Sequence, residues 1–236
     1  VILLLMVGGS IYVSHIRRQI PEVVMQTIHV PPGQRVELIL ADHTSVWLNA
    51  GSTFTFPNVF SVDSREVVLD GEAYFNVRKN AGQPFTVKTS SYNITVLGTE
   101  FNVLAYNRSS LFEVSLFNGS VDVYSENGNK KIRLEPNTKV YLSNNRFIKE
   151  YISNYNQYLW KDGLICFDDE QVEGMISKLE LYYDVKITVQ NNSFKKQKYT
   201  GKFRTKDGIE HILKVFQLKD KFSYEKDDEK NIITIK

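Results

Sequence analysis

Short runs in which apolar and polar residues alternate fill the chain from Thr27 to about Leu142. No stretch in this region repeats apolar residues at the spacing of a helix. A period of two is typical of strands that bury one face. The runs lie at Val36–Leu40, Val46–Leu48, Phe54–Phe56, Val67–Leu69, Phe75–Val77, Ile94–Val96, Phe101–Val103, Val114–Leu116 and Val121–Val123.

Turn-forming residues separate these runs, among them Pro32-Gly33, Asp70-Gly71 and Asn118-Gly119. Glycine reaches the positive φ angles that tight turns require. Strands that recur every 8 to 12 residues or so indicate a sandwich, a barrel or a solenoid, and the pattern does not choose among them. We predict an all-β module over residues 27–146, with Trp47 facing its core.

A different pattern follows residues 147–160, a polar and aromatic segment that we interpret as a linker. Beyond it, two apolar stripes at helical spacing each follow a strand-like run. Asp168 and Asp169 are candidate N-caps for the first helix, and Asp207 with Glu210 has the spacing of a capping box for the second. The stripes are Val172, Met175, Ile176, Leu179 and Tyr183, then Ile209, Ile212, Leu213 and Phe216.

These elements predict a small α+β module over residues 161–236 with the order β-α-β-β-α-β-β. The chain as a whole is therefore predicted to be mainly β. The strands of the second module are expected at Leu164–Phe167, Val185–Val189, Tyr199–Arg204, Phe222–Lys226 and Ile232–Ile235.

The first residues form an uncharged apolar run from Val1 to Val13. A membrane-spanning helix needs about 20 apolar residues, so we interpret residues 1–16 as the C-terminal part of such a helix. The alternatives are a signal-peptide remnant and a buried core helix. Arg17 and Arg18 would usually mark a cytoplasmic flank, but the opposite flank is not in the chain, so charge does not give the orientation.

Composition and charge exclude several classes of protein. The 29 basic and 27 acidic residues nearly cancel, which leaves no global field to attract nucleic acid or an anionic membrane. Cys166 is the only cysteine, so an intrachain disulfide is excluded. Its apolar neighbours place it on a strand, as a small core residue rather than a nucleophile.

The search for reactive groups predicts no catalytic, cofactor-binding or metal-binding residues. The four histidines show no paired metal-ligand spacing, and no nucleophile elbow, dinucleotide or phosphate loop is present. The alternative to a regulator is a carbohydrate- or wall-binding β-sandwich tethered to a membrane. It requires an exposed aromatic platform at Trp47 or Trp160, whereas we expect Trp160 to pack the two modules together.

A cluster of basic residues interleaved with aromatic ones runs from Lys195 to Lys206. Such a strand could be a solvated edge, a protein-docking edge or a surface for single-stranded nucleic acid. Residues 160–236 carry 15 basic and 14 acidic residues, so we predict no nucleic-acid partner. We expect strand addition at Tyr199, Gly201 and Phe203 to be the partner-binding site.

Several segments in order resemble the FecR family. Leu40-Ala-Asp-His-Thr-Ser-Val-Trp-Leu-Asn-Ala-Gly-Ser52 is similar to the family's L-x-D-G-T-x-V-W-L-N-A-G-S, with His43 where the family usually has glycine. The resemblance covers residues 27–142, and the tail from about 160 is similar, in element order, to the small STN-like C-terminal domain of many members. Further matches are Val30-Pro-Pro-Gly-Gln-Arg35, Arg65-Glu-Val-Val-Leu-Asp-Gly-Glu-Ala-Tyr-Phe-Asn-Val77, Pro84-Phe85-Thr-Val87 and Val96-Leu-Gly-Thr-Glu-Phe-Asn-Val103.

The resemblance implies a membrane-anchored anti-sigma factor or sigma regulator without enzymatic activity or cofactor. Its implied partners are the signalling domain of a TonB-dependent outer-membrane transporter, an extracytoplasmic-function sigma factor and a regulatory protease. The sigma factor would bind a cytoplasmic segment that precedes the membrane span. The implied location is the inner membrane, crossed once, with residues from about 17 onward in the periplasm.

Overall fold

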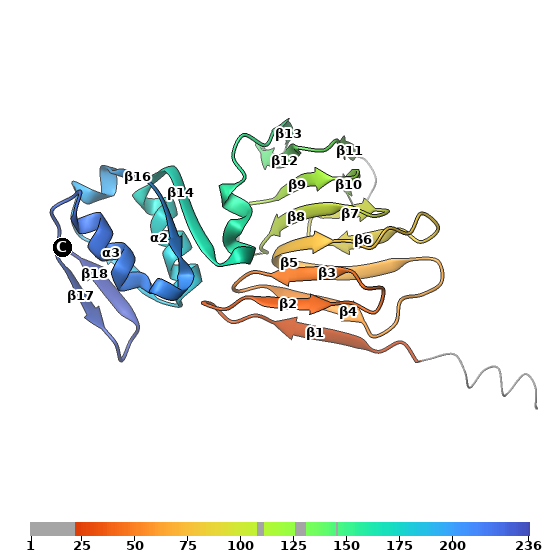
Figure 1. Ribbon diagram of the computed structural model, residues 1–236, viewed down its shortest axis with the longest axis horizontal. Coiled ribbons are helices and arrows are strands. Elements are labelled where there is room, and N and C mark those ends of the chain that lie inside the picture. The colour runs from red at the N-terminus through yellow and green to blue at the C-terminus, as the bar shows by residue number, and fades with distance from the viewer. Residues whose placement is uncertain (1–21, 108–110, 126–130, 145) are drawn as a thin grey trace, which may run out of the picture.

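The computed structural model describes residues 22–107, 111–125, 131–144 and 146–236. A β-rich module and a small α+β module follow each other along the long axis of the molecule (Figure 1). We call residues 25–151 the β module and residues 164–235 the C-terminal module. The membrane-helix prediction for residues 1–16 lies outside the described residues, and no helix within them is long and apolar enough to cross a membrane.

The β module consists of two sheets that share the long strand β5. The first sheet has the order β1-β4-β5-β6-β7-β10-β11, and the second has the order β2-β3-β5-β8-β9-β12-β13. All pairs are antiparallel except β5 with β6. The strands are β1 (Met25–His29), β2 (Val36–Ile39), β3 (Ser45–Leu48), β4 (Thr53–Pro57), β5 (Arg65–Asn76), β6 (Phe85–Lys88), β7 (Tyr92–Val96), β8 (Glu100–Ala105), β9 (Glu113–Asn118), β10 (Val121–Ser125), β11 (Lys131–Leu134), β12 (Thr138–Ser143) and β13 (Arg146–Tyr151).

Strand β5 passes from one sheet to the other at Gly71. Thr53 of β4 pairs with Asp70 in the first sheet, whereas Gly71 already pairs with Ala105 of β8 in the second. Gly71 has φ = 136°, and a Cβ there would lie 2.3 Å from the Ser52 hydroxyl oxygen. Only glycine fits this crossing, because it alone combines that backbone angle with no side chain.

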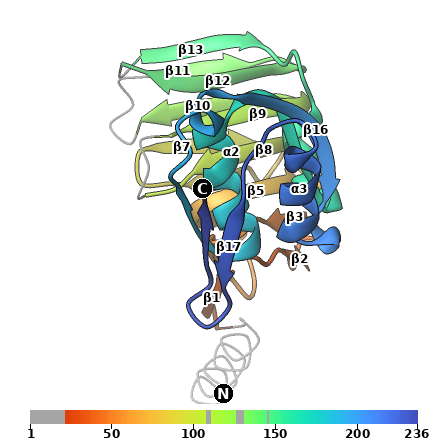
Figure 2. The same ribbon diagram turned by 90° about the vertical axis from the view of Figure 1, so that its left-hand side faces the viewer.

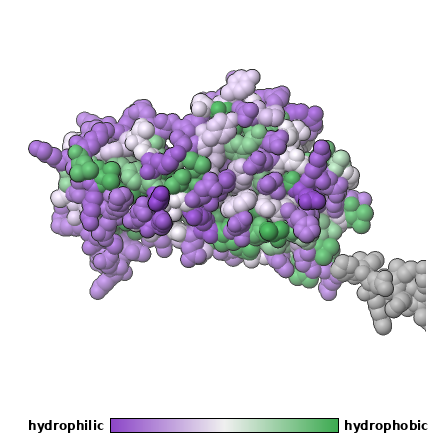
Figure 3. All heavy atoms as spheres, in the orientation of Figure 1, coloured by the Kyte–Doolittle hydropathy of each residue, from purple (hydrophilic) through white to green (hydrophobic). Residues whose placement is uncertain are grey.

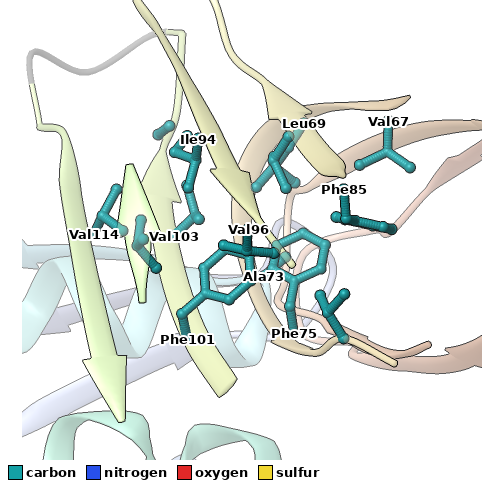
Figure 4. Close-up of a cluster of buried hydrophobic side chains, with 14 of the residues drawn as sticks. Val67, Leu69, Ala73, Phe75, Phe85, Ile94, Val96, Phe101, Val103 and Val114 are labelled. Atoms are coloured by element: carbon teal, nitrogen blue, oxygen red, sulfur yellow. The ribbon is translucent and has the colours of Figure 1, made fainter. Parts of the chain in front are cut away.

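The core of the β module fills the space between the two sheets (Figure 4). Phe75 and Phe101 stack with ring centroids 5.0 Å apart, and Phe85 meets Phe75 edge-on at 6.1 Å. Each of these rings is fully buried. The alternating runs therefore place one residue in two between the sheets, as their period predicted.

The C-terminal module has the predicted order β-α-β-β-α-β-β. Strands β14 and β16 form an antiparallel pair, while β15, β18 and β17 form a second, mixed sheet. Figure 2 shows this module in front of the β module, seen along the long axis. Its elements are β14 (Leu164–Gln171), α2 (Val172–Tyr183), β15 (Lys186–Val189), β16 (Lys198–Arg204), α3 (Ile209–Gln217), β17 (Tyr224–Asp227) and β18 (Ile232–Ile235), with short 3-10 turns η2 (Phe194–Lys196) and η3 (Thr205–Asp207).

Both predicted helical stripes are confirmed, but the predicted caps are wrong. Asp168 and Asp169 lie inside β14, at an irregularity in its pairing with β16, and Gln171 is the residue before α2. Helix α3 begins after Gly208, and neither helix has a side-chain cap. The cap spacing in the sequence was misleading, because strand pairing and the turn at Gly208 determine where the helices start.

The segment expected as a linker, residues 147–160, is ordered by packing on the β module. Its first part belongs to β13, which pairs with β12, and Phe147 packs against Tyr92 with ring centroids 4.8 Å apart. Its second part belongs to the 3-10 helix η1 (Asn156–Asp162). The weak periodicity of this segment reflects two short elements that bury aromatic rings.

Candidate functional site

Three elements form the junction between the modules: the turn between β1 and β2, the helix η1 and the C-terminal half of α2. The Gly33 amide donates to the Leu181 carbonyl at 2.8 Å. The Arg35 guanidinium donates to the Trp160 carbonyl and the Thr205 hydroxyl, each at 3.4 Å. The start of the β module is thus tied directly to the C-terminal module.

A buried polar cluster lies in this junction, centred on Glu72 of β5. The Asn49 side-chain amide donates to one carboxylate oxygen of Glu72 at 2.7 Å, and the Asn102 amide donates to the other at 3.0 Å. Asn49 also donates to the Tyr182 hydroxyl of α2 at 3.3 Å. Both asparagines are almost fully buried. The cluster therefore joins three strands of the β module to a helix of the C-terminal module.

Burial raises the pKa of Glu72, an effect that the two asparagine hydrogen bonds oppose and nearby Glu113 reinforces. Among the described residues, no lysine or arginine contributes to this shift. Burial also raises the pKa of Tyr182, with a further contribution from the Glu72 charge. The junction thus holds a carboxylate that is stabilised by neutral donors, chiefly the amides of Asn49 and Asn102.

A cavity of about 340 Å³ adjoins Glu72, with walls from both modules. Its walls are mainly apolar, including Leu104, Leu164 and Leu181. A second, more polar hollow of about 290 Å³ lies nearby, and the two share Cys166 and Lys178. The volume of the first cavity, about 340 Å³, is within the range of small-ligand pockets.

The titratable groups around these hollows do not form a nucleophile–base pair. Cys166 is half-buried and lines both hollows, so its predicted place in the core is wrong. Partial burial raises the pKa of its thiol, an effect that Lys202 and Lys178 oppose. No histidine lines either hollow. In the part of the chain that the structure describes, no cluster of three or more potential metal ligands is found.

The helix η1 packs aromatic side chains onto the outer face of the second sheet. Tyr158 meets Phe117 edge-on, with ring centroids 4.8 Å apart, and its hydroxyl donates to Ser115 at 2.7 Å. Trp160 is 2% exposed, in agreement with its predicted place between the modules and against a sugar-binding platform there.

The predicted core position of Trp47 is wrong. Its neighbours Val46 and Leu48 are fully buried, whereas Trp47 points to the opposite face and is half-buried. There it meets Tyr74 edge-on at 6.0 Å, and the Lys161 ammonium lies 5.9 Å from its ring centroid. The alternation was correct, but η1 covers the outer face of the sheet, so both faces hold large side chains.

Strand β16 carries Tyr199, Gly201 and Phe203, the three residues predicted to bind a partner, and the rings of Tyr199 and Phe203 point inward. Tyr199 is buried against Phe216 of α3, with ring centroids 4.3 Å apart. Phe203 is half-buried and meets Phe216 edge-on at 5.7 Å. A partner could therefore use the backbone of this strand but not the Tyr199 ring. Whether a partner binds this strand stays a prediction.

The backbone pattern of β16 shows which residues face its unpaired side. The Thr205 amide donates to the Gly163 carbonyl, and the Val172 amide donates to the Gln197 carbonyl, so the odd-numbered positions face β14. Because backbone groups alternate sides in an antiparallel pair, Thr200, Lys202 and Arg204 face away from β14. No other described strand pairs with β16. We call these three residues the docking edge.

Sequence reasoning missed the cluster at Glu72. Asn102 lies within a predicted strand-like run, and Asn49 and Glu72 lie between such runs, so alternation gave none of the three a role. The available signal was that Asn49 and Glu72 both belong to the segments that resemble FecR proteins. Their convergence depends on pairing between β3, β5 and β8, which connects residues far apart in the chain.

Comparisons with known proteins agree with this architecture. Residues 26–122 match the family described as FecR protein, and residues 164–235 match the family described as FecR, C-terminal. Two crystal structures of a candidate anti-sigma factor from Parabacteroides distasonis ATCC 8503 are similar, at 30% identity and TM-scores of 0.75 and 0.76. The similarity covers 89% and 90% of this chain and 98% of each of theirs. A search of curated proteins found no match.

Proposed function

Because the chain belongs to the FecR family, we propose that it is a membrane-anchored anti-sigma factor that regulates transcription without catalysing a reaction. The observation that carries this proposal is the match of both FecR modules in order, together with 30% identity to a candidate anti-sigma factor over nearly its full length. The raised pKa of the half-buried Cys166 thiol is consistent with a regulatory role.

The signal enters, in this proposal, by contact with the periplasmic signalling domain of a TonB-dependent outer-membrane transporter. The docking edge at Thr200, Lys202 and Arg204 supports this, because an unpaired edge offers backbone donors and acceptors to an added strand. The junction offers a route onward, since α2 and η1 contact the turn after β1. A regulatory protease and an extracytoplasmic-function sigma factor would act downstream, at the inner membrane and in the cytoplasm.

Two substitutions at Lys202 test the docking edge. Lys202→Pro removes the backbone N–H that faces the partner and leaves the hydrogen bonds to β14 in place, whereas Lys202→Ala removes only the charge. We expect the proline variant to lose most of its affinity for the transporter domain, and the alanine variant to bind within about threefold of the original chain.

The measurement is titration calorimetry of the full chain in nanodiscs with the purified transporter domain, with circular dichroism to confirm folding. A proline variant that is folded and binds normally would exclude the docking edge. A parallel reporter assay for the sigma factor tests the anti-sigma role itself. If deletion of this protein leaves the reporter output unchanged, the anti-sigma role is refuted.

A further inference from the structure

Five exposed apolar side chains gather at the end of the β module where the described chain begins. They come from the start of β1 and from the loop between β4 and β5. We call them the distal patch: Val23, Val24, Met25, Val59 and Val62, with exposed fractions of 57%, 50%, 54%, 37% and 90%. Figure 3 shows apolar surface at this end of the molecule.

Backbone contacts hold the two segments of the distal patch together. The Val24 amide donates to the Asn58 side chain and the Asn58 amide donates to the Val24 carbonyl, both at 2.9 Å. Met25 pairs with Pro57 in the first sheet. The start of β1 and the loop that follows β4 are therefore held side by side.

Val62 stands at the tip of a fixed turn. The Ser61 hydroxyl donates to the Ser64 carbonyl at 3.0 Å and accepts from the Ser64 amide at 3.1 Å, which closes the turn around Val62 and Asp63. Gln83 donates to the Ser61 carbonyl from the neighbouring loop. These bonds hold a large apolar side chain in solvent, where it gains nothing from the fold.

Basic residues accompany the patch. Arg78 and Lys79 are exposed in the loop that contains Gln83, and the Arg65 guanidinium binds the Arg78 carbonyl at 2.9 Å. Of the acids nearby, Asp42 is paired with Arg65 at 2.7 Å, whereas Glu22 and Asp63 are exposed. Apolar tips flanked by cations are the pattern of surfaces that lie at a lipid interface.

We propose that the distal patch lies on the membrane surface and contacts anionic phospholipids. In this arrangement the β module binds the bilayer directly, in addition to being connected to the membrane anchor. The inference rests on the membrane anchoring in the proposed function. Val13, the last residue of the uncharged run, and Val23 are ten positions apart. That connection spans at most about 35 Å even when extended, which keeps the patch within reach of the lipid surface.

The test compares two labelled positions in the full chain, reconstituted in nanodiscs in a Cys166→Ser background. Val62→Cys and Leu218→Cys each receive an environment-sensitive nitrobenzoxadiazole dye. Leu218 is a matched control because it is 87% exposed and follows α3, at the opposite end of the molecule. We expect blue-shifted emission, and quenching by nitroxide-labelled lipid headgroups, at position 62 but not at position 218.

Lipid composition provides the second arm. Replacing part of the phosphatidylcholine by phosphatidylglycerol should increase quenching at position 62, and Arg78→Gln with Lys79→Gln should abolish that increase. Equal quenching at positions 62 and 218 in chains that co-elute with nanodiscs would refute the contact between the distal patch and lipid, but not the proposed membrane anchoring. A chain that does not co-elute with nanodiscs would refute the anchoring and the patch together.

Discussion

Strand β5 carries two charged side chains inside the fold, fully buried Arg65 near the distal patch and half-buried Glu72 at the junction, and their surroundings differ. Arg65 is 1% exposed and bonds to the Asp42 carboxylate and to the carbonyls of Arg78 and Gln83. The Glu72 carboxylate accepts from the side-chain amides of Asn49 and Asn102, which are neutral. One charge is matched by an opposite charge, and the other is not.

We call the Arg65 end of β5 the locked end and the Glu72 end the responsive end, because their charges are held in different ways. A paired, multiply bonded guanidinium holds two loops in one arrangement, and loss of either charge leaves the other without compensation. A carboxylate held by amides, beside a cavity and in contact with α2 through Asn49, responds to protonation and to the position of the C-terminal module. Each end of the strand can be tested separately.

The largest expected effect is at the locked end. Arg65→Leu removes the guanidinium, which leaves Asp42 without its counter-charge and the carbonyls of Arg78 and Gln83 without this donor. We expect a loss of about 3 to 5 kcal/mol in the free energy of unfolding, the range for breaking one partner of a buried ion pair. Urea denaturation followed by tryptophan fluorescence measures it.

The neighbouring pair of Lys88 and Glu66 provides the control, since both side chains are about half exposed and 2.8 Å apart. Lys88→Ala should change the free energy of unfolding by no more than about 1 kcal/mol. Similar losses for Arg65→Leu and Lys88→Ala would mean that the guanidinium site is not the lock that its contacts indicate.

In the β module, periodicity in the sequence predicted strands β2 to β5 and β7 to β10 but not β1, β6 or β11 to β13. It also predicted both helices, because these patterns depend on neighbours within a few residues. The stripe of Ile209, Ile212, Leu213 and Phe216 is buried as predicted. The face of Trp47 was not predictable, because alternation separates two faces without showing that η1 covers the second one. The predicted helix starts were wrong for a similar reason, because pairing between β14 and β16 extends the strand past Asp168 and Asp169.

The responsive end predicts a pH dependence. Burial raises the folded-state pKa of Glu72 above the ordinary 4.5, so the unfolded chain releases this proton at lower pH than the folded chain. The contribution of Glu72 is therefore most favourable below about pH 4.5 and declines as the pH rises through the folded-state pKa. The decline is at most about 1.4 kcal/mol per pH unit.

Glu72→Gln removes this proton and with it the decline. Asn102 has a buried carbonyl oxygen without a partner, which an amide at position 72 could use after the Asn102 side chain turns over. The variant should match the original chain at low pH and exceed its stability at pH 8, in urea titrations across that range. Glu66→Gln, at an exposed site, should leave the pH profile unchanged. If the stability of Glu72→Gln and that of the original chain vary in parallel with pH, the raised pKa of Glu72 is disproved.

The junction shows the limit of sequence reasoning about the site. Residues 49, 72, 102 and 182 are distant in the chain, and only strand register and the docking of α2 bring them together. The partner strand was chosen from its composition, which identified β16 but not its free side. The backbone hydrogen bonds at the Gly163 and Gln197 carbonyls show that the backbone groups of Lys202, and not those of Gly201, face the unpaired side of β16.

The smallest expected effect returns to the locked end. His43, where FecR proteins usually have glycine, has φ = 66° in the turn beside Asp42, the partner of Arg65. A left-handed backbone strains any residue with a Cβ, although histidine tolerates it better than most. His43→Gly should raise the free energy of unfolding by about 0.5 to 1 kcal/mol, because relief of strain outweighs the added freedom of the unfolded chain. Thermal unfolding measures this, and His43→Ala, which keeps the Cβ, should show no gain. A loss of stability in the glycine variant would mean that the imidazole itself supports the loops around Arg65.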